Sequence, residues 1–269
     1  MEPDAPVLSR GAPPRLRAAA FVILAAAVVA WDAVAPHLEQ VALWPNVAII
    51  AVGVLPATLG LIYLALPLWS HRRVVLIGVV ALGVTAIVTW EANAHLASNF
   101  AKLGAYTCAG WAFLWLFEEL GWVVIVAAII PFVDAFSVAA GPTKDIVNHH
   151  AEVYSAVAVA FVAPGGVAAG LGPPDVLFFA LFLATTVRWH LRPGWTWLAM
   201  TGMYSLTLVL ANATDVNGLP ALPFLSVGFL LTLSHRAPTT PRTRRAACAG
   251  TCPPASRAVA RSRIPRVAP

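Results

Sequence analysis

The sequence has 269 residues, of which 59% are hydrophobic and only 11% are charged. A soluble domain of this size carries about twice that share of charged residues, and the apolar blocks here approach the roughly 20 residues that a membrane helix needs. These properties predict an all-α polytopic membrane protein and exclude a membrane β-barrel, whose strands alternate over about ten residues. The net charge of +5 comes from arginines at the two ends and in short loops, which is typical of cytoplasmic segments of membrane proteins and not of nucleic-acid binding.

The apolar blocks predict eight transmembrane helices, or nine if one N-terminal helix escapes this count. They lie at about 18–35, 46–69, 74–90, 103–117, 121–140, 174–189, 195–212 and 217–234. The polar ends, residues 1–17 and 235–269, are rich in Pro and Arg and are expected to be disordered and cytoplasmic. Between them we expect a first group of helices in residues 18–120 and a second group in residues 121–234.

The first span has a second interpretation as a cleaved signal peptide, because the triplet A-V-A at 33–35 resembles a cleavage site. Pro36 would directly follow the cut and Asp32 would lie beside it, and both disfavour cleavage. We therefore interpret residues 18–35 as a retained span with Asp32 at the membrane interface.

The longest internal connection, residues 141–173, has a polar first part and an apolar second part. The apolar stretch 153–170 is rich in Val and Ala but is broken by Pro164, Gly165 and Gly166. It is too short and too broken for a span, which favours a re-entrant, interfacial or partly extended segment.

The charged loops predict the orientation through the excess of Lys and Arg on the cytoplasmic side. With eight spans, the basic loops 70–73 and 188–192 and the basic tail fall on the same side as the N-terminus. The loops around Glu39 and at 212–218 fall on the other side. Both termini are therefore expected in the cytoplasm, with the chain in the plasma membrane.

Two aspartates lie in consecutive predicted spans, in VDAFSVAAGP and LGPPDVLFFALF. Asp134 is expected about 20 Å into one helix and Asp175 near the outer start of the next, which places both at a similar depth. A carboxylate in hydrocarbon is costly, so it usually has a partner or a function. Two adjacent carboxyls share a proton and can activate water while polarising a carbonyl, which is aspartic-protease chemistry. The simpler alternative for Asp175, which follows Pro174, is capping of a helix N-terminus.

A third element begins the last predicted span with Pro220, Ala221, Leu222 and Pro223. The two prolines remove backbone donors and disfavour helix ahead of each ring. Unwound backbone at membrane depth is tolerated only against protein or a wet cavity. The alternative interpretation is an ordinary helix start with proline in the first turn.

In this order and spacing the three elements resemble the intramembrane aspartyl proteases, the presenilin and signal peptide peptidase family. In that family one span carries Tyr-Asp, the next carries G-x-G-D, and the last begins with P-A-L. Here Asp134, Asp175 and the P-A-L-P sequence at 220–223 match these motifs. The resemblance covers about residues 121–234, which would form the catalytic half of a presenilin-like fold.

The resemblance implies an intramembrane endopeptidase with Asp134 and Asp175 as the catalytic dyad and without a metal or other cofactor. Its partners would be the lipid bilayer and a transmembrane segment or signal peptide as substrate. The inferred orientation is similar to that of the signal peptide peptidases. The stretch 153–170 lies where the family contacts substrate, and we expect it to add a strand to an unwound substrate.

The sequence departs from the family motifs at two positions. Val133 stands where the family usually has Tyr, and the G-x-G-D motif reads Gly172-Pro173-Pro174-Asp175. A proline fixes φ and removes an N–H, where glycine would permit close approach of the backbone. Gly172, Pro173, Pro174 and the 220–223 segment are nevertheless expected to shape the site.

Two other functions use the same residues. A proton-coupled transporter or channel would use the two acids as a relay, and a non-catalytic family member would bind transmembrane segments without cutting them. His149 and His150 beside Glu152 are interpreted as solvated loop residues, because a metal site needs more ligands. Cys248 and Cys252 alone are weak evidence for a metal.

Overall fold

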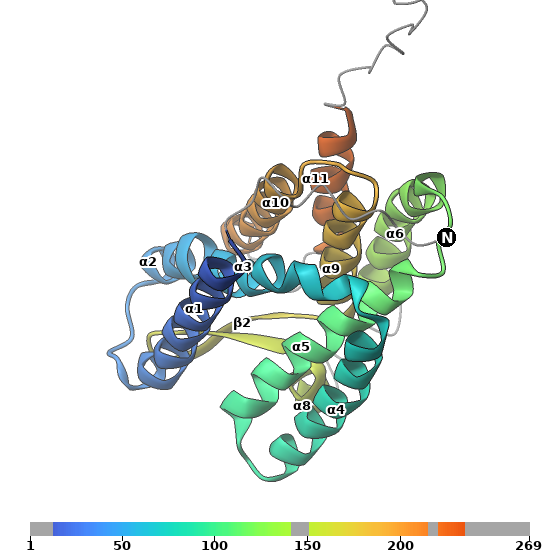
Figure 1. Cartoon of the computed structure of the whole chain (residues 1–269). Helices are drawn as coiled ribbons and strands as arrows, with labels where there is room; N and C mark the ends of the chain where they lie inside the picture. Colours follow the sequence, from blue (N-terminus) through green and yellow to red (C-terminus); the bar gives the residue numbers. More distant parts are fainter. Residues whose placement is uncertain (1–12, 141–150, 215–219, 235–269) are drawn as a thin grey trace, which may run out of the picture. The chain divides into compact units, whose positions relative to one another are not determined.

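The computed structural model describes residues 13–140, 151–214 and 220–234, and these are mainly helical (Figure 1). Much of the two ends predicted to be disordered, and the segment 141–150 with its histidines, lie outside the described residues. In chain order the elements are α1 (Pro14–Val34), η2 (Ala35–His37), α2 (Leu43–Ala48), the π-helical turn η3 (Ile49–Val54), α3 (Leu55–Ala65), η4 (Leu66–Ser70), α4 (Arg72–Glu91), α5 (His95–Leu114), α6 (Leu120–Ala140), α8 (Ala151–Val157), β1 (Val159–Ala163), β2 (Gly166–Leu171), α9 (Pro173–Arg188), α10 (Pro193–Ala213) and α11 (Leu222–Ser234).

Four helical segments of the described chain are long and apolar enough to cross a membrane. They are Pro14–His37, Leu43–Ser70, Arg72–Glu91 and Leu120–Ser137. This confirms a helical membrane protein but not the predicted count of eight or nine spans. Helices α9 and α11 have only 16 and 13 residues, and α5 and α10 are long enough but more polar. In α5, for example, Ser98, Asn99 and Lys102 interrupt the apolar sequence.

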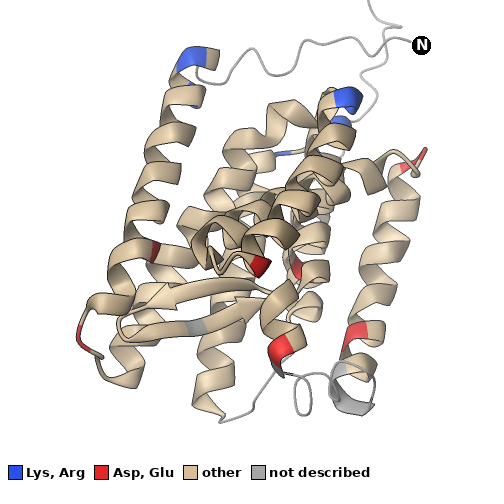
Figure 2. Cartoon of the chain, turned by 90° about the horizontal axis from the view of Figure 1, so that it is seen from below, with Lys and Arg blue, Asp and Glu red and all other residues tan. Residues whose placement is uncertain are grey.

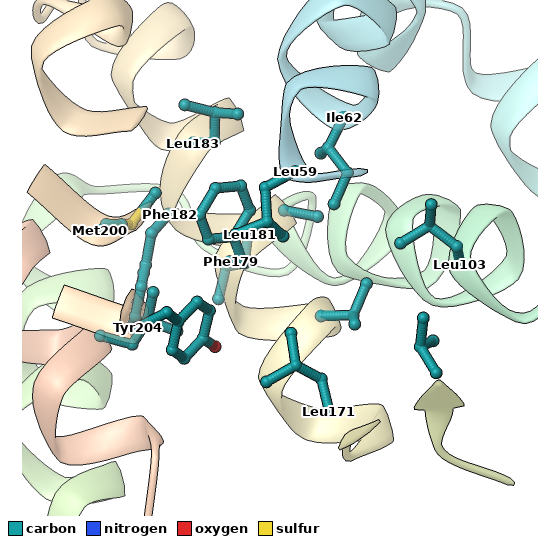
Figure 3. Packing of buried hydrophobic residues seen from close by; sticks show 14 of the residues in the cluster. Leu59, Ile62, Leu103, Leu171, Phe179, Leu181, Phe182, Leu183, Met200 and Tyr204 are labelled. Carbon is teal, nitrogen blue, oxygen red and sulfur yellow. The ribbon is translucent and has the colours of Figure 1, made fainter. Parts of the chain in front are cut away.

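The buried core centres on α9, which packs against α5, α10 and α11 (Figure 3). Phe179 stacks on Tyr204 of α10 with ring centroids 6.0 Å apart, and Phe182 stacks on Phe229 of α11 at 4.5 Å. A Cβ on Gly110 of α5 would lie 2.3 Å from the Leu177 carbonyl oxygen, so only glycine allows α5 to approach α9 this closely. These contacts fix the position of α9 and therefore of Asp175 in its first turn.

A two-stranded antiparallel hairpin of β1 and β2 precedes α9. Pro164 and Gly165 form its turn, and Gly165 and Gly166 have φ angles of 93° and 131°. Residues with a side chain rarely adopt these angles, which explains the two glycines. The prediction of a partly extended segment is therefore confirmed, and among the described residues this hairpin is the exception to an all-helical class.

Side chains of neighbouring helices form hydrogen bonds with the outer edge of β1 and with Ala158, the residue before it. Three carbonyls on this edge accept hydrogen bonds from α5 and α1. The pairs are Lys102 Nζ to Ala158 O at 2.7 Å, Asn99 Nδ2 to Ala160 O at 2.8 Å and Trp31 Nε1 to Val162 O at 2.8 Å. Asn99 Oδ1 also accepts the Ala160 N–H at 2.7 Å. Another strand therefore cannot pair with this edge without displacing these side chains.

The outer edge of β2 is the more open edge of the hairpin, with one long side-chain hydrogen bond among the described residues in place of the four on β1. Ala160 lies opposite Gly170, and because Ala160 directs its N–H and carbonyl to Asn99, Gly170 directs its own away from β1. Gly170 is exposed, and its carbonyl accepts a 3.3 Å bond from the Tyr154 hydroxyl of α8. A further strand would thus add to β2.

We expect Asn99→Ala to destabilise the hairpin region by about 1–3 kcal/mol, because it leaves both polar groups of Ala160 without their partner. Thermal unfolding of the full chain in detergent, followed by circular dichroism, measures the change. Asn212→Ala is the matched control, since the Asn212 amide bonds only to the Leu208 carbonyl of its own helix, and it should change stability by less than about 0.5 kcal/mol. Equal losses in both variants would contradict the role given to Asn99.

Candidate functional site

Asp134 lies on the inward face of α6. Val123 and Ala127 on the same face are fully buried, and Asp134 follows about two turns after Ala127 and is half-buried. Val133, at the position of the family's tyrosine, is 60% exposed and therefore points away from this face. Its substitution removes no side chain from the surroundings of Asp134.

The P-A-L-P segment reaches Asp134 directly. The backbone N–H of Leu222 donates to Asp134 Oδ2 at 3.2 Å, and α11 begins at the same residue. The Leu222 N–H is one of the donors that a helix N-terminus otherwise leaves unpaired. The next residue, Pro223, has no N–H to donate. The Asp134 carboxyl therefore lies at the positive end of the α11 dipole.

Asp175 occupies the third position of α9, after Gly172 as N-cap and Pro173 and Pro174 in the first two positions. Its Oδ2 accepts the Gly172 N–H at 2.9 Å, which is the capping role considered as the simpler alternative. The two prolines lie where a helix has no partner for an N–H, so they remove no hydrogen bond. The N-cap residue Gly172 has ordinary extended backbone angles, with φ of −65° and ψ of 160°. Pro174 in the second helical position therefore belongs to a regular helix start.

The structure brings the two acids together at the beginnings of α9 and α11. The Asp134 carboxyl lies close enough to Asp175 to interact with it electrostatically. Each carboxyl accepts a backbone N–H at a helix start, where the helix dipole favours negative charge by about 0.3–1 kcal/mol. Helices α9 and α11 also contact α6. The arrangement places the two carboxyls within electrostatic range of each other and gives each one a backbone donor that stabilises its charge.

Two tyrosines complete the site, and neither could be identified from the sequence alone. The Tyr204 hydroxyl of α10 donates to the Asp175 carbonyl at 2.9 Å, and Tyr204 is 2% exposed. It interacts electrostatically with both acids. Burial, together with the Asp175 carboxylate, raises the pKa of Tyr154, so its hydroxyl remains a donor at neutral pH. Both are separated from Asp175 by more than 20 residues of sequence and are found only by the fold.

Tyr204→Phe is expected to lower the turnover of any reaction at the two acids by about tenfold, because it removes one hydrogen bond that positions Asp175. The ring and its stacking on Phe179 remain, so KM should be unchanged while kcat falls. Tyr106→Phe is the control, because its hydroxyl bonds to the Val157 carbonyl away from both acids. A rise in KM with unchanged kcat would contradict this role for Tyr204. An equal loss of kcat in the Tyr106→Phe control would contradict it as well.

Two charged residues of the described chain are buried. Asp32, predicted at the membrane interface, is 7% exposed, and no described residue donates a hydrogen bond to its Oδ1. It lies one turn after buried Val28, on the inward face of α1. Lys102, which directly precedes the predicted span 103–117, is 5% exposed within α5, because α5 begins at His95 and turns it towards the hairpin.

No group of three or more His, Cys, Asp and Glu side chains in the described part of the chain is arranged to hold a metal ion. His149, His150, Cys248 and Cys252 lie outside that part. Asp134 and Asp175 by themselves offer two carboxyls.

Comparison with known proteins gives no match: no family model, curated protein or solved structure is similar to the chain. The family resemblance therefore rests on Asp134, Asp175, the 220–223 segment and their order.

Proposed function

We propose that the chain is an intramembrane aspartyl endopeptidase related to the presenilin and signal peptide peptidase family, with Asp134 and Asp175 as its catalytic dyad. The observation that carries the proposal is the convergence of three separate segments: Asp134 of α6 accepts the Leu222 N–H of the P-A-L-P segment and lies near Asp175 of α9. Two acids that only capped their own helices would not have to lie close to each other.

In the proposed reaction the ionised carboxyl takes a proton from a water molecule, whose oxygen forms a bond to the scissile carbonyl carbon. The protonated carboxyl donates to the carbonyl oxygen as negative charge develops on it. The tetrahedral intermediate then collapses, the C–N bond breaks, and the departing nitrogen receives a proton from the dyad. The Gly172 and Leu222 N–H groups hold the two carboxyls in place through these steps, and Tyr204 holds the backbone carbonyl of Asp175.

The proposed substrate is a transmembrane segment or signal peptide that unwinds at the site. A helix hides its scissile carbonyls, so the segment must become extended before it is cut. The open edge of β2 offers backbone groups for an added strand, and β2 leads within one residue to Gly172 and α9. Gly172, Pro173, Pro174 and the 220–223 segment would form the walls around the extended substrate.

In the proposed arrangement eight helices cross the membrane. Both termini lie in the cytoplasm, and the chain resides in the plasma membrane. In Figure 2 the visible Lys and Arg segments lie towards one end of the helices. That end would face the cytoplasm, since positive charge is retained on this side.

The test is cleavage of a model single-span substrate by the purified full chain in lipid vesicles, followed by mass spectrometry of the fragments. We expect a cut within the span and labelling of the chain by a transition-state-analogue inhibitor of aspartyl proteases. Retention of the substrate without cleavage, or proton-driven transport without labelling, would contradict the proposal.

A further inference from the structure

A continuous apolar groove runs along α1. Two cavities of about 520 Å³ and 220 Å³ share Leu24 and Ala57 as lining residues, so they adjoin each other between α1 and α3. The larger cavity extends to α10 and the smaller one to Trp31. Both α1 and the segment containing α3 are apolar enough to cross a membrane, so the groove is accessible to lipid.

One end of this groove carries a positive charge. Arg17 Nε donates to the Leu64 carbonyl at 3.0 Å, and its guanidinium also donates to the Tyr63 carbonyl. Tyr63 and Leu64 line the larger cavity, so Arg17 lies at its end. The guanidinium lies 5.4 Å from the centroid of the Tyr63 ring, and within the described residues no carboxylate acts on it.

The aromatic ring of Trp197 from α10 also lines this cavity and extends its apolar wall. Arg17 is therefore the charged group at this end of the groove. It has five N–H donors in all and keeps several for a ligand after its two carbonyl bonds.

We propose that this groove binds one acyl chain of an anionic phospholipid, with the phosphate held by Arg17. From Arg17 to Trp31 the helix extends about 21 Å, which exceeds the roughly 15 Å depth of one leaflet of the hydrocarbon core. The apolar walls match an acyl chain, and the charge at one end matches a phosphate rather than a zwitterionic headgroup. This site does not depend on the chemistry proposed for Asp134 and Asp175.

Native mass spectrometry of the full chain in detergent tests the proposal, with dioleoyl phosphatidylglycerol and dioleoyl phosphatidylcholine as probes. We expect the wild-type chain to prefer phosphatidylglycerol about fivefold, as one arginine near a headgroup provides. Arg17→Gln should remove this preference, and Ala57→Leu, at the junction of the two cavities, should reduce binding of both lipids. Arg15→Gln, which changes an exposed arginine two residues earlier, is the matched control and should keep the preference.

Equal binding of the two lipids by the wild-type chain, or equal effects of Arg17→Gln and Arg15→Gln, would overturn the proposal. Undiminished binding by Ala57→Leu would place the lipid elsewhere and would also overturn it. Glycerol phosphate in excess should not displace the lipid, and displacement would show that the site takes a free phosphate instead. Circular dichroism of each variant confirms that the helices are retained.

Discussion

Replacing either Asp134 or Asp175 with asparagine is expected to lower cleavage of a single-span substrate by about 10²- to 10⁴-fold, because the dyad then loses the proton that it transfers. The fold should remain, since the asparagine carbonyl oxygen can still accept the Leu222 or Gly172 N–H. Fragment yield in lipid vesicles measures the loss. The double variant should be no worse than either single one, because the two carboxyls act as a unit.

Asp32→Asn is the matched control for this experiment. Asp32 is also an acid within a membrane-spanning helix and is buried, but it has no electrostatic contact with Asp134 or Asp175. Cleavage by this variant should stay within about twofold of the wild type. Full activity in either dyad variant would remove the catalytic assignment.

Gly170→Pro is expected to lower cleavage by at least about tenfold without unfolding the hairpin. The Gly170 N–H points away from β1, so proline at this edge breaks no hydrogen bond of the existing pair. The proline does remove the N–H that would donate to an added substrate strand. The substrate then loses about one hydrogen bond to β2 and the register that this bond sets. Cleavage and thermal unfolding should both be measured, so that a loss of activity is separated from a loss of fold.

Gly170→Ala is the control for the proline variant. A Cβ at this position would make ordinary contacts of 3.6 Å with Ala158 and 3.7 Å with Tyr154, and the N–H remains. This variant should cleave nearly as well as the wild type. If the alanine and proline variants cleave equally, the edge of β2 does not receive the substrate.

The sequence was sufficient for the positions of most helices, because long apolar blocks have few other interpretations. It also predicted the partly extended segment, since Pro164 and Gly165 interrupt a stretch rich in Val and Ala. The number of spans could not be predicted from apolar blocks alone. Helix α9 matches the predicted block 174–189 but has only 16 residues, and α11 begins at Leu222, so Pro220 and Ala221 of its predicted block are not helical.

The candidate site was predicted only in part for a related reason. Asp134 and Asp175 were identifiable because acids are rare in apolar spans. Tyr204 was not, since a tyrosine in an apolar helix has no distinguishing context until the fold places its hydroxyl on the Asp175 carbonyl. Asn99 and Lys102 were missed because their partners are backbone carbonyls of the hairpin, and a backbone carbonyl leaves no trace in the sequence.

The short helices α9 and α11 have a consequence for the membrane around them. Their 16 and 13 residues give lengths of about 24 Å and 20 Å, less than the roughly 30 Å thickness of the hydrocarbon core. Both start beside the two acids. In the proposed eight-helix arrangement, hydrophobic mismatch at these two helices would thin the bilayer locally and bring bulk water towards Asp134 and Asp175 without a dedicated channel. The thickness of the host membrane would then determine how readily water reaches the site.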